Sequence, residues 1–186
     1  MSRKRSTEPP PWPVAPRPFA DEPLGSWFGR VASAYRLTVE QLWSTAGLVE
    51  ALPQPSVGWL LTTGLCRNDR RRLAALARLD AQVLEAIEPP QAWAADRRRL
   101  AYCFACLVLN PLDVAAPYWK REWLSPEASF CDVHDRTLAW VTASLLKKAG
   151  HFKQLHRTIL KKHHRAKKAQ YGLSLHLQDW WTYSQH

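Results

Sequence analysis

The apolar positions that follow residue 20 recur with the period of an α-helix. They are Leu24, Trp27, Phe28, Val31, Ala34 and Tyr35. Spacings of three and four residues place these side chains on one helix face, which a globular protein buries. Asp21 has the side chain of an N-cap and Pro23 suits a first turn, so we expect a helix from Asp21 to about Tyr35.

A second helix is predicted directly afterwards, and the pattern then repeats. Thr38 and Gln41 have the spacing of a capping box, in which each side chain bonds the other residue's backbone amide. Residues 30–42 align with residues 72–84, and Asp80 takes the place of Thr38 as N-cap. We therefore predict two helix-turn-helix-like units. A plain helical hairpin in a bundle fits the same pattern.

Apolar positions after His134 again recur at helical spacing. They are Leu138, Val141, Leu145, Ala149, Phe152, Leu155, Ile159 and Leu160. The pattern predicts a helical segment from residue 138 onward, with a break at Gly150. Glycine in a helix interior lowers helix stability, which favours the break at that point.

The remaining faces of this segment are strongly basic. Residues 147–168 contain four histidines, no acidic residue and nine lysines or arginines. The nine are Lys147, Lys148, Lys153, Arg157, Lys161, Lys162, Arg165, Lys167 and Lys168. Like charges four residues apart repel each other on a helix, and an anionic partner relieves that repulsion. We expect this surface to bind nucleic acid; another anionic surface or a merely solubilising face are the alternatives.

Three of the four cysteines form a metal-binding pattern with one histidine. Cys103 and Cys106 are separated by two residues, as are Cys131 and His134, and 24 residues lie between the pairs. Thiolate and imidazole donors at this spacing suit one tetrahedral Zn²⁺. With four protein ligands the ion has no open position, so we predict one structural zinc. Buried thiols beside an unrelated histidine are the alternative interpretation.

The segment between the ligand pairs is rich in proline and aromatic residues. Ser125, Pro126 and Glu127 resemble an N-cap followed by proline at the first helical position. They predict a short helix that leads to Cys131. Cys66 lies outside the cluster and is expected to be an inert buried thiol.

Composition narrows the function classes. The 186 residues are 46% hydrophobic, and 26 lysines and arginines against 16 acidic residues give a formal charge of +10. A basic chain of this kind favours nucleic acid, with an anionic membrane as second candidate. No apolar run approaches the roughly 18 residues of a membrane span, so we expect a soluble, cytoplasmic protein without membrane partner. No His-Glu-x-x-His set is present, so an enzyme with a small-molecule substrate is not expected.

Six prolines between residues 9 and 18 predict an extended amino-terminal arm. Trp12 and Phe19 interrupt this proline-rich arm. An extended segment with isolated aromatic side chains can dock on a partner or on its own domain, and the pattern does not separate these outcomes. We therefore divide the chain into four parts: the arm at 1–18, the helical units at 19–92, the zinc module at 93–137 and the basic segment at 138–186.

These motifs together resemble the TniQ family of transposon target-selection proteins. The family opening, Pro-x-x-Asp-Glu-x-Leu-x-Ser-Trp, is similar to Pro18 through Trp27. The family zinc ribbon runs Tyr-Cys-Pro-x-Cys-Leu, then Trp, then Cys-x-x-His, and is similar to Tyr102–Leu107, Trp123 and Cys131–His134. This chain departs at Phe104, where the family has proline, and at Arg36, where it has glycine.

The resemblance implies a mainly α fold with a single zinc ribbon and a non-enzymatic adaptor. Such an adaptor binds an AAA+ transposition ATPase that assembles on DNA, and links it to a target that an RNA-guided CRISPR effector supplies in some members. On this basis we expect bacterial, nucleoid-associated localisation, and partner contacts at Trp12, Arg17, Phe19 and Trp27. The basic segment is expected to lie along nucleic acid, on the ground of its charge, and a guide RNA or a CRISPR effector is a further candidate partner. A zinc-stabilised helix-turn-helix transcription regulator is the alternative.

Overall fold

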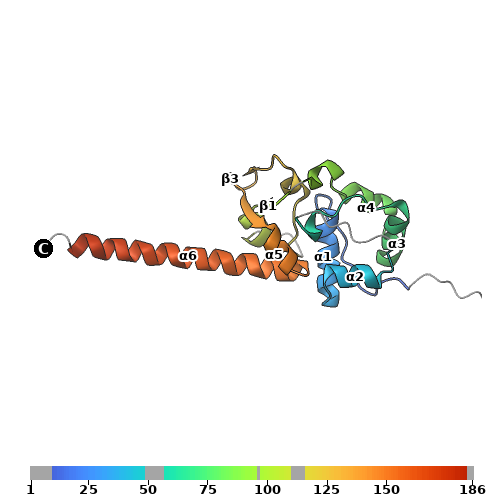
Figure 1. Ribbon diagram of the computed structural model, residues 1–186, viewed down its shortest axis with the longest axis horizontal. Helices are drawn as coiled ribbons and strands as arrows, with labels where there is room; N and C mark the ends of the chain where they lie inside the picture. Colours follow the sequence, from blue (N-terminus) through green and yellow to red (C-terminus); the bar gives the residue numbers. More distant parts are fainter. Residues whose placement is uncertain (1–9, 49–56, 96, 110–115, 184–186) are drawn as a thin grey trace, which may run out of the picture.

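A helical body, a small β module beside it and one long helix that projects away make up the molecule (Figure 1). The computed structural model describes residues 10–48, 57–95, 97–109 and 116–183, with side chains as far as residue 168. This is the predicted mainly α architecture. Within the described part of the chain, no helix is long and apolar enough to cross a membrane.

The first helical unit matches the sequence prediction apart from its starting residue. Helix α1 spans Leu24–Tyr35 and helix α2 spans Val39–Thr45. The predicted N-cap at Asp21 is wrong, because the backbone becomes helical only after Pro23. The capping box is confirmed: the Gln41 amide donates to Thr38 Oγ1 at 3.1 Å, and the Thr38 amide donates to Gln41 Oε1 at 2.9 Å.

The second unit repeats the first in its backbone. Helix α3 spans Arg67–Ala77 and helix α4 spans Ala81–Ile87, with Asp80 accepting a hydrogen bond from the Gln82 amide. The turns also correspond, since Arg36 and Arg78 both have positive φ, at 57° and 53°. A short 3₁₀ turn, η1, spans Trp59–Leu61 and packs against α1. The repeat seen in the sequence is therefore a repeat in structure.

The β module is built from two short antiparallel pairs. Strand β1 (Arg99–Tyr102) pairs with β4 (Ala139–Thr142), and β2 (Phe130–Cys131) pairs with β3 (Arg136–Thr137). The expected helix over residues 138–142 is wrong, because these residues complete a sheet with β1, placing Val141 opposite Leu100. An apolar pattern this short cannot separate a strand from a helix.

Three further short turns connect these elements. A 3₁₀ turn η2 spans Gln91–Ala94, a single π-helical turn η3 spans Ala105–Leu109, and a 3₁₀ turn η4 spans Arg121–Leu124. The helix predicted after Ser125 is wrong: η4 ends before that residue, and a turn follows it. The amide of Ser125 bonds back to the carbonyl of Glu122, so this serine closes one turn and does not open a new helix.

The chain ends in two helices that meet at Gly150. Helix α5 spans Ala143–Lys148 and helix α6 spans Phe152–Tyr183, so the predicted break is confirmed. Gly150 passes close to Thr38, where a Cβ would collide with the threonine side chain. The indole Nε1 of Trp59 donates to the carbonyl of Ala149 at 2.7 Å, which anchors this junction to the body.

The core is unusually rich in indole rings. Trp27, Trp59, Trp119 and Trp123 are all fully buried and connect α1, η1 and the β module into one hydrophobic cluster. Helix α6 packs its first turns across α1. The β module and α6 are therefore both packed against the amino-terminal helical unit.

Candidate metal centre and basic surface

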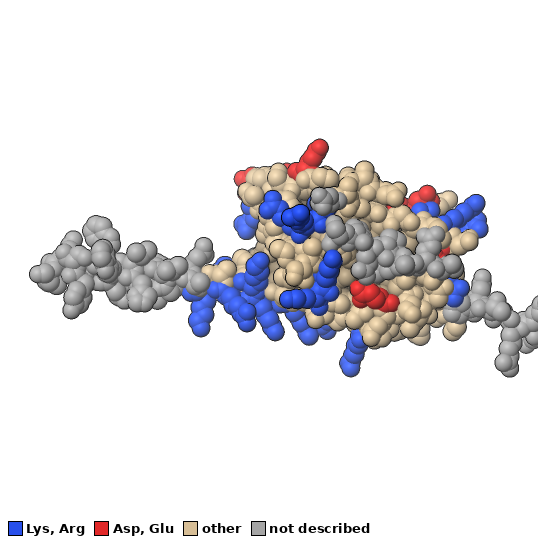
Figure 2. Space-filling view, in the orientation of Figure 1, with Lys and Arg blue, Asp and Glu red and all other residues tan. Residues whose placement is uncertain are grey.

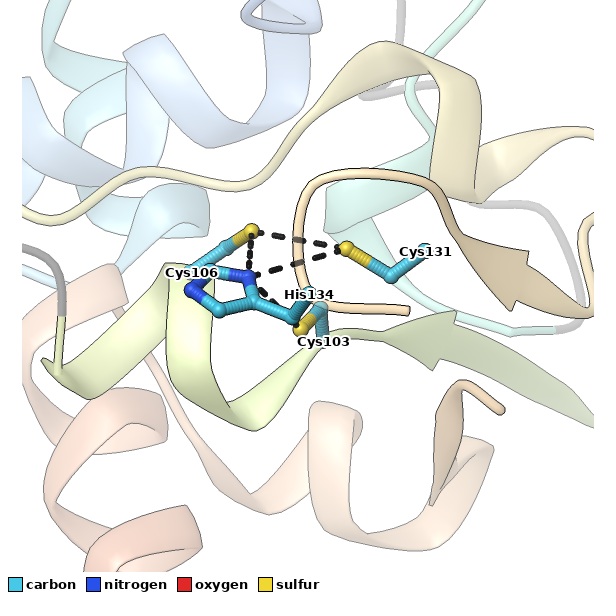
Figure 3. A group of neighbouring side chains, drawn as sticks. All are labelled: Cys103, Cys106, Cys131 and His134. Atoms are coloured by element: carbon cyan, nitrogen blue, oxygen red, sulfur yellow. Dashed lines mark hydrogen bonds between the residues drawn. The ribbon is translucent and has the colours of Figure 1, made fainter. Parts of the chain in front are cut away.

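The four predicted metal ligands are supplied by two separate segments, the passage from β1 into η3 and the β2–β3 hairpin. Cys103 directly follows β1, and Cys106 lies in the following helical turn η3. Cys131 ends β2, and His134 lies in the tight turn that leads to β3. Figure 3 shows the four side chains pointing toward one another from these two sides. The two segments belong to separate two-stranded sheets, and their ligands meet at a common centre.

Most of the following distances between ligand atoms are close to the edges of a tetrahedral site. His134 Nδ1 lies 3.1 Å from Cys106 Sγ, 3.6 Å from Cys103 Sγ and 3.8 Å from Cys131 Sγ, while the Cys106 and Cys131 sulfurs are 3.6 Å apart. All ligand atoms lie within 4.8 Å of one another. Tetrahedral bonds of roughly 2.3 Å to sulfur and 2.0 Å to nitrogen give edges of about 3.5–3.8 Å. The residues therefore form a group that could hold one metal ion.

Electrostatics also favour a cation at this point. Burial raises the pKa of the Cys106 thiol, and the neighbouring sulfurs of Cys131 and Cys103 raise it further. Burial acts in the same direction on Cys131, but hydrogen bonds from the backbone amides of His134 and Val133 and from the other thiols leave its pKa lowered. The Cys106 thiol therefore resists ionisation beside its neighbouring sulfurs, and a divalent ion would offset the repulsion among the thiolates it binds.

The segment that carries Cys103 and Cys106 contacts the long helix α6. Phe104 lies between two ligands, and its ring stacks on His163 of α6 with centroids 3.6 Å apart and planes 13° from parallel. The turn η3 that carries Cys106 packs on α6 as well. The position at which this chain departs from the Tyr-Cys-Pro-x-Cys pattern is thus the position that connects the metal-binding loop to α6.

Comparison with known protein families shows which family the chain belongs to. A model of the TniQ family matches residues 13–138, about two thirds of the chain and all four candidate ligands. The chain belongs to the TniQ family. TniQ proteins are non-catalytic adaptors of transposition, and a closed four-ligand centre fits a structural role in such a protein. A search among curated proteins found no significant match.

The predicted basic residues of this TniQ protein form one exposed surface. Lys147 and Lys148 end α5, the other seven lie on α6, and all nine are exposed. Figure 2 shows lysine and arginine side chains projecting from the described part of the α6 rod, with no acidic side chain among them on the face in view. At 100° per residue, Lys153 and Arg157 lie about 160° around the helix from Leu155 of the packed face, Lys161 about 120° and Arg165 about 80°. This surface lies beyond the family match.

The four expected partner contacts occupy different environments. The amide of Trp12 donates to the carbonyl of Leu76 at 2.7 Å, so the described part of the arm docks on its own domain. The Phe19 ring stacks on Tyr118 at 4.3 Å between centroids, and Arg17 is exposed. Trp27 is 0% exposed, and its indole donates to the carbonyl of Pro16. No Trp27 surface is accessible in this structure, and the hydrogen bond connects the arm to α1; the expected partner contact stays a prediction.

Sequence reasoning missed a buried ion pair that fixes the start of α1. The carboxylate of Glu22, 0% exposed, accepts hydrogen bonds from Arg30 Nε at 2.8 Å and Arg30 Nη2 at 2.6 Å. Ser26 Oγ donates to the same carboxylate at 2.7 Å, and Arg30 Nη2 also donates to the carbonyl of Arg17. Glu22 and Arg30 are eight residues apart, so no helical spacing rule connects them.

Proposed function

We propose that this TniQ protein is a non-enzymatic recruitment adaptor. It connects an AAA+ transposition ATPase on DNA to a targeting complex, for which an RNA-guided CRISPR effector is one candidate. The arm and the first helical unit would contact the ATPase, through Trp12, Arg17 and Phe19. The basic surface of α5 and α6 would lie along nucleic acid. The observation that carries the proposal is a nine-cation surface, free of acids, on a rod attached to a TniQ body.

The proposed ion is a single structural Zn²⁺. Three thiolates and one imidazole in tetrahedral spacing are a donor set that zinc prefers, and this set leaves no position for water or substrate. Such an ion would bind the β1–η3 segment to the β2–β3 hairpin. Because Phe104 stacks on His163, this link would also fix the direction of α6 relative to the body.

The contacts proposed for α6 supply affinity and not sequence recognition. Lysines and arginines bind phosphates of any sequence, and each neutralised phosphate releases a counterion. If six of these cations bind duplex phosphates, the association constant falls by a factor of about 10³ between roughly 50 and 200 mM salt. Base preference would come from the targeting complex, which reads sequence by base pairing.

A salt titration tests this assignment. Binding of a fluorescein-labelled duplex is followed by anisotropy for the wild type and for a variant in which four α6 cations become glutamine. These four are Lys161, Lys162, Arg165 and Lys168. The matched control replaces four exposed arginines of the helical units, Arg36, Arg67, Arg71 and Arg78.

The α6 variant should lose about 3–4 units of the salt slope, while the control keeps the slope of the wild type. A flat salt dependence of the wild type would refute nucleic-acid binding by α6. Loss of binding in the control alone, with a defined footprint of half-sites, would instead support a helix-turn-helix regulator.

A further inference from the structure

A groove of about 550 Å³ lies between the arm, α1 and the first turns of α6. Its apolar walls are formed by Pro16, Ala34, Ala116, Pro117, Phe152 and Leu160. Pockets of several hundred Å³ with mainly apolar walls are typical of binding sites, and this volume holds one large side chain with its adjoining backbone. Neither the metal centre nor the exposed face of α6 accounts for the groove.

Some of the polar groups that line the groove already have hydrogen-bond or ion-pair partners, and others have none among the described residues. Arg30 is paired with Glu22, and Ser33 Oγ donates to the carbonyl of Gly29 and accepts from the Lys153 amide at 3.0 Å. In contrast, the side chains of Lys153 and Arg157 are exposed and form no ion pair with a described carboxylate. They lie one turn apart on α6, at the same edge of the groove.

The groove therefore has a positive rim above an apolar floor. None of the described residues that line it is acidic. Burial lowers the pKa of the adjacent His151, and the charges of Arg157 and Lys153 lower it further, as expected where positive potential accumulates. His156 lines the same wall, and its Nε2 is buried without a hydrogen-bond partner among the described residues.

We propose that this groove binds a peptide segment of a partner protein in which a large apolar side chain is flanked by carboxylates. The apolar side chain would fill the space between Ala34 and Leu160, and the carboxylates would pair with Lys153 and Arg157. Charge complementarity selects the acidic flanks, since the two rim cations form no ion pair with any carboxylate in the described part of the chain. A nucleobase is a poorer occupant, because the walls offer few uncommitted groups for its polar edges. This goes beyond the adaptor role by naming the chemistry of a protein ligand.

Three synthetic peptides test the proposal by fluorescence anisotropy. The probe is fluorescein-labelled Asp-Glu-Trp-Glu-Asp; one control replaces its tryptophan with alanine, and the other replaces its acids with the corresponding amides. Each control peptide should bind at least about tenfold more weakly than the probe, because it loses either the buried side chain or the charge pairing. Equal binding of the alanine peptide would overturn the proposal, since charge alone would then explain the affinity.

A groove-filling substitution locates the binding. Ala34→Trp fills the cavity from an exposed helical position, and Ala75→Trp makes the same change on the exposed face of α3. Ala34→Trp should weaken probe binding at least about tenfold and leave duplex binding unchanged, whereas Ala75→Trp changes neither. Unchanged probe binding in Ala34→Trp would refute the site. Loss of duplex binding without loss of probe binding would assign the groove to nucleic acid, which also refutes it.

Amide chemical-shift mapping locates the bound peptide on the wild-type protein, so it does not depend on a variant that folds. Addition of the probe peptide should shift amides at the carboxyl-terminal end of α1 and the first turns of α6. Shifts confined to the outer part of α6, around Arg165, would mean that the peptide binds the exposed cations, and the groove proposal would fail.

Discussion

Removal of Arg30 should destabilise the protein strongly, because it leaves a buried carboxylate without its cation. Glu22 is 0% exposed and Arg30 is 8% exposed, so water does not replace the lost partner. Breaking a buried ion pair from one side costs about 3–5 kcal/mol. The carboxylate keeps the hydroxyl of Ser26 at 2.7 Å and the amide of Phe19 at 3.3 Å, so for Arg30→Met we expect about 3 kcal/mol, the lower end of that range.

The sign of the pH dependence follows from Glu22. Burial raises the pKa of this carboxyl, and the hydrogen bonds and charge of Arg30 lower it only in part. In Arg30→Met the folded-state pKa rises further above the unfolded value of about 4.3. A raised folded-state pKa means that the folded protein binds the proton more tightly than the unfolded chain does. The loss of unfolding free energy caused by the buried carboxylate is therefore absent below the unfolded pKa and grows as pH rises toward the folded pKa.

Urea unfolding followed by tryptophan fluorescence measures the effect at neutral and mildly acidic pH. The control is Glu22→Gln/Arg30→Met, which has no buried charge and should recover about 2 kcal/mol of the loss. Because residue 22 no longer titrates in this double variant, the variant's own unfolding free energy should carry no contribution from that position as pH changes. A loss below about 1 kcal/mol in Arg30→Met would refute the reasoning, and so would a double variant as unstable as the single one.

Two further predictions concern the metal centre and the first interhelical turn. Purified protein should contain about one equivalent of zinc, and chelation or Cys131→Ser should unfold residues 100–135, since structural sites contribute on the order of 10 kcal/mol. Because burial raises the pKa of Cys106, protons compete with the ion for the thiolate, and the affinity for zinc should fall as pH falls. Protein that is fully folded without metal would contradict the prediction of a structural zinc. Arg36 has φ of 57°, so Arg36→Gly should raise the unfolding free energy by roughly 0.5–1 kcal/mol and Arg36→Ala should not, as thermal melting can show.

Features that local chemistry determines were predictable from the sequence. The capping box at Thr38 and the cap at Asp80 depend on residues within one helical turn, and both are present. The ligand pairs were recognisable because two-residue spacing within each pair meets the geometry of one ion. The positive φ of Arg36 also explains why glycine suits that position in the family, since glycine adopts it without strain.

Features that depend on distant partners were not predictable. Residues 139–142 form a strand because β1, some 40 positions earlier, supplies the hydrogen bonds. The Glu22–Arg30 pair and the groove between α1 and α6 arise from packing, and single-sequence patterns carry no signal for either. Phe104 was visible as a departure from the family pattern, but its contact with His163 required the folded chain.

The adaptor role is tested most directly by recruitment to an AAA+ transposition ATPase on DNA. At about 200 mM salt, where phosphate contacts of α6 alone are weak, the protein should cosediment with the ATPase–DNA complex when ATP is present and stay in solution when it is absent. Arg17→Glu, an exposed change in the docked arm, should reduce this recruitment without altering duplex binding. Cosedimentation that is independent of ATP, or none with either nucleotide state, would contradict the proposed function.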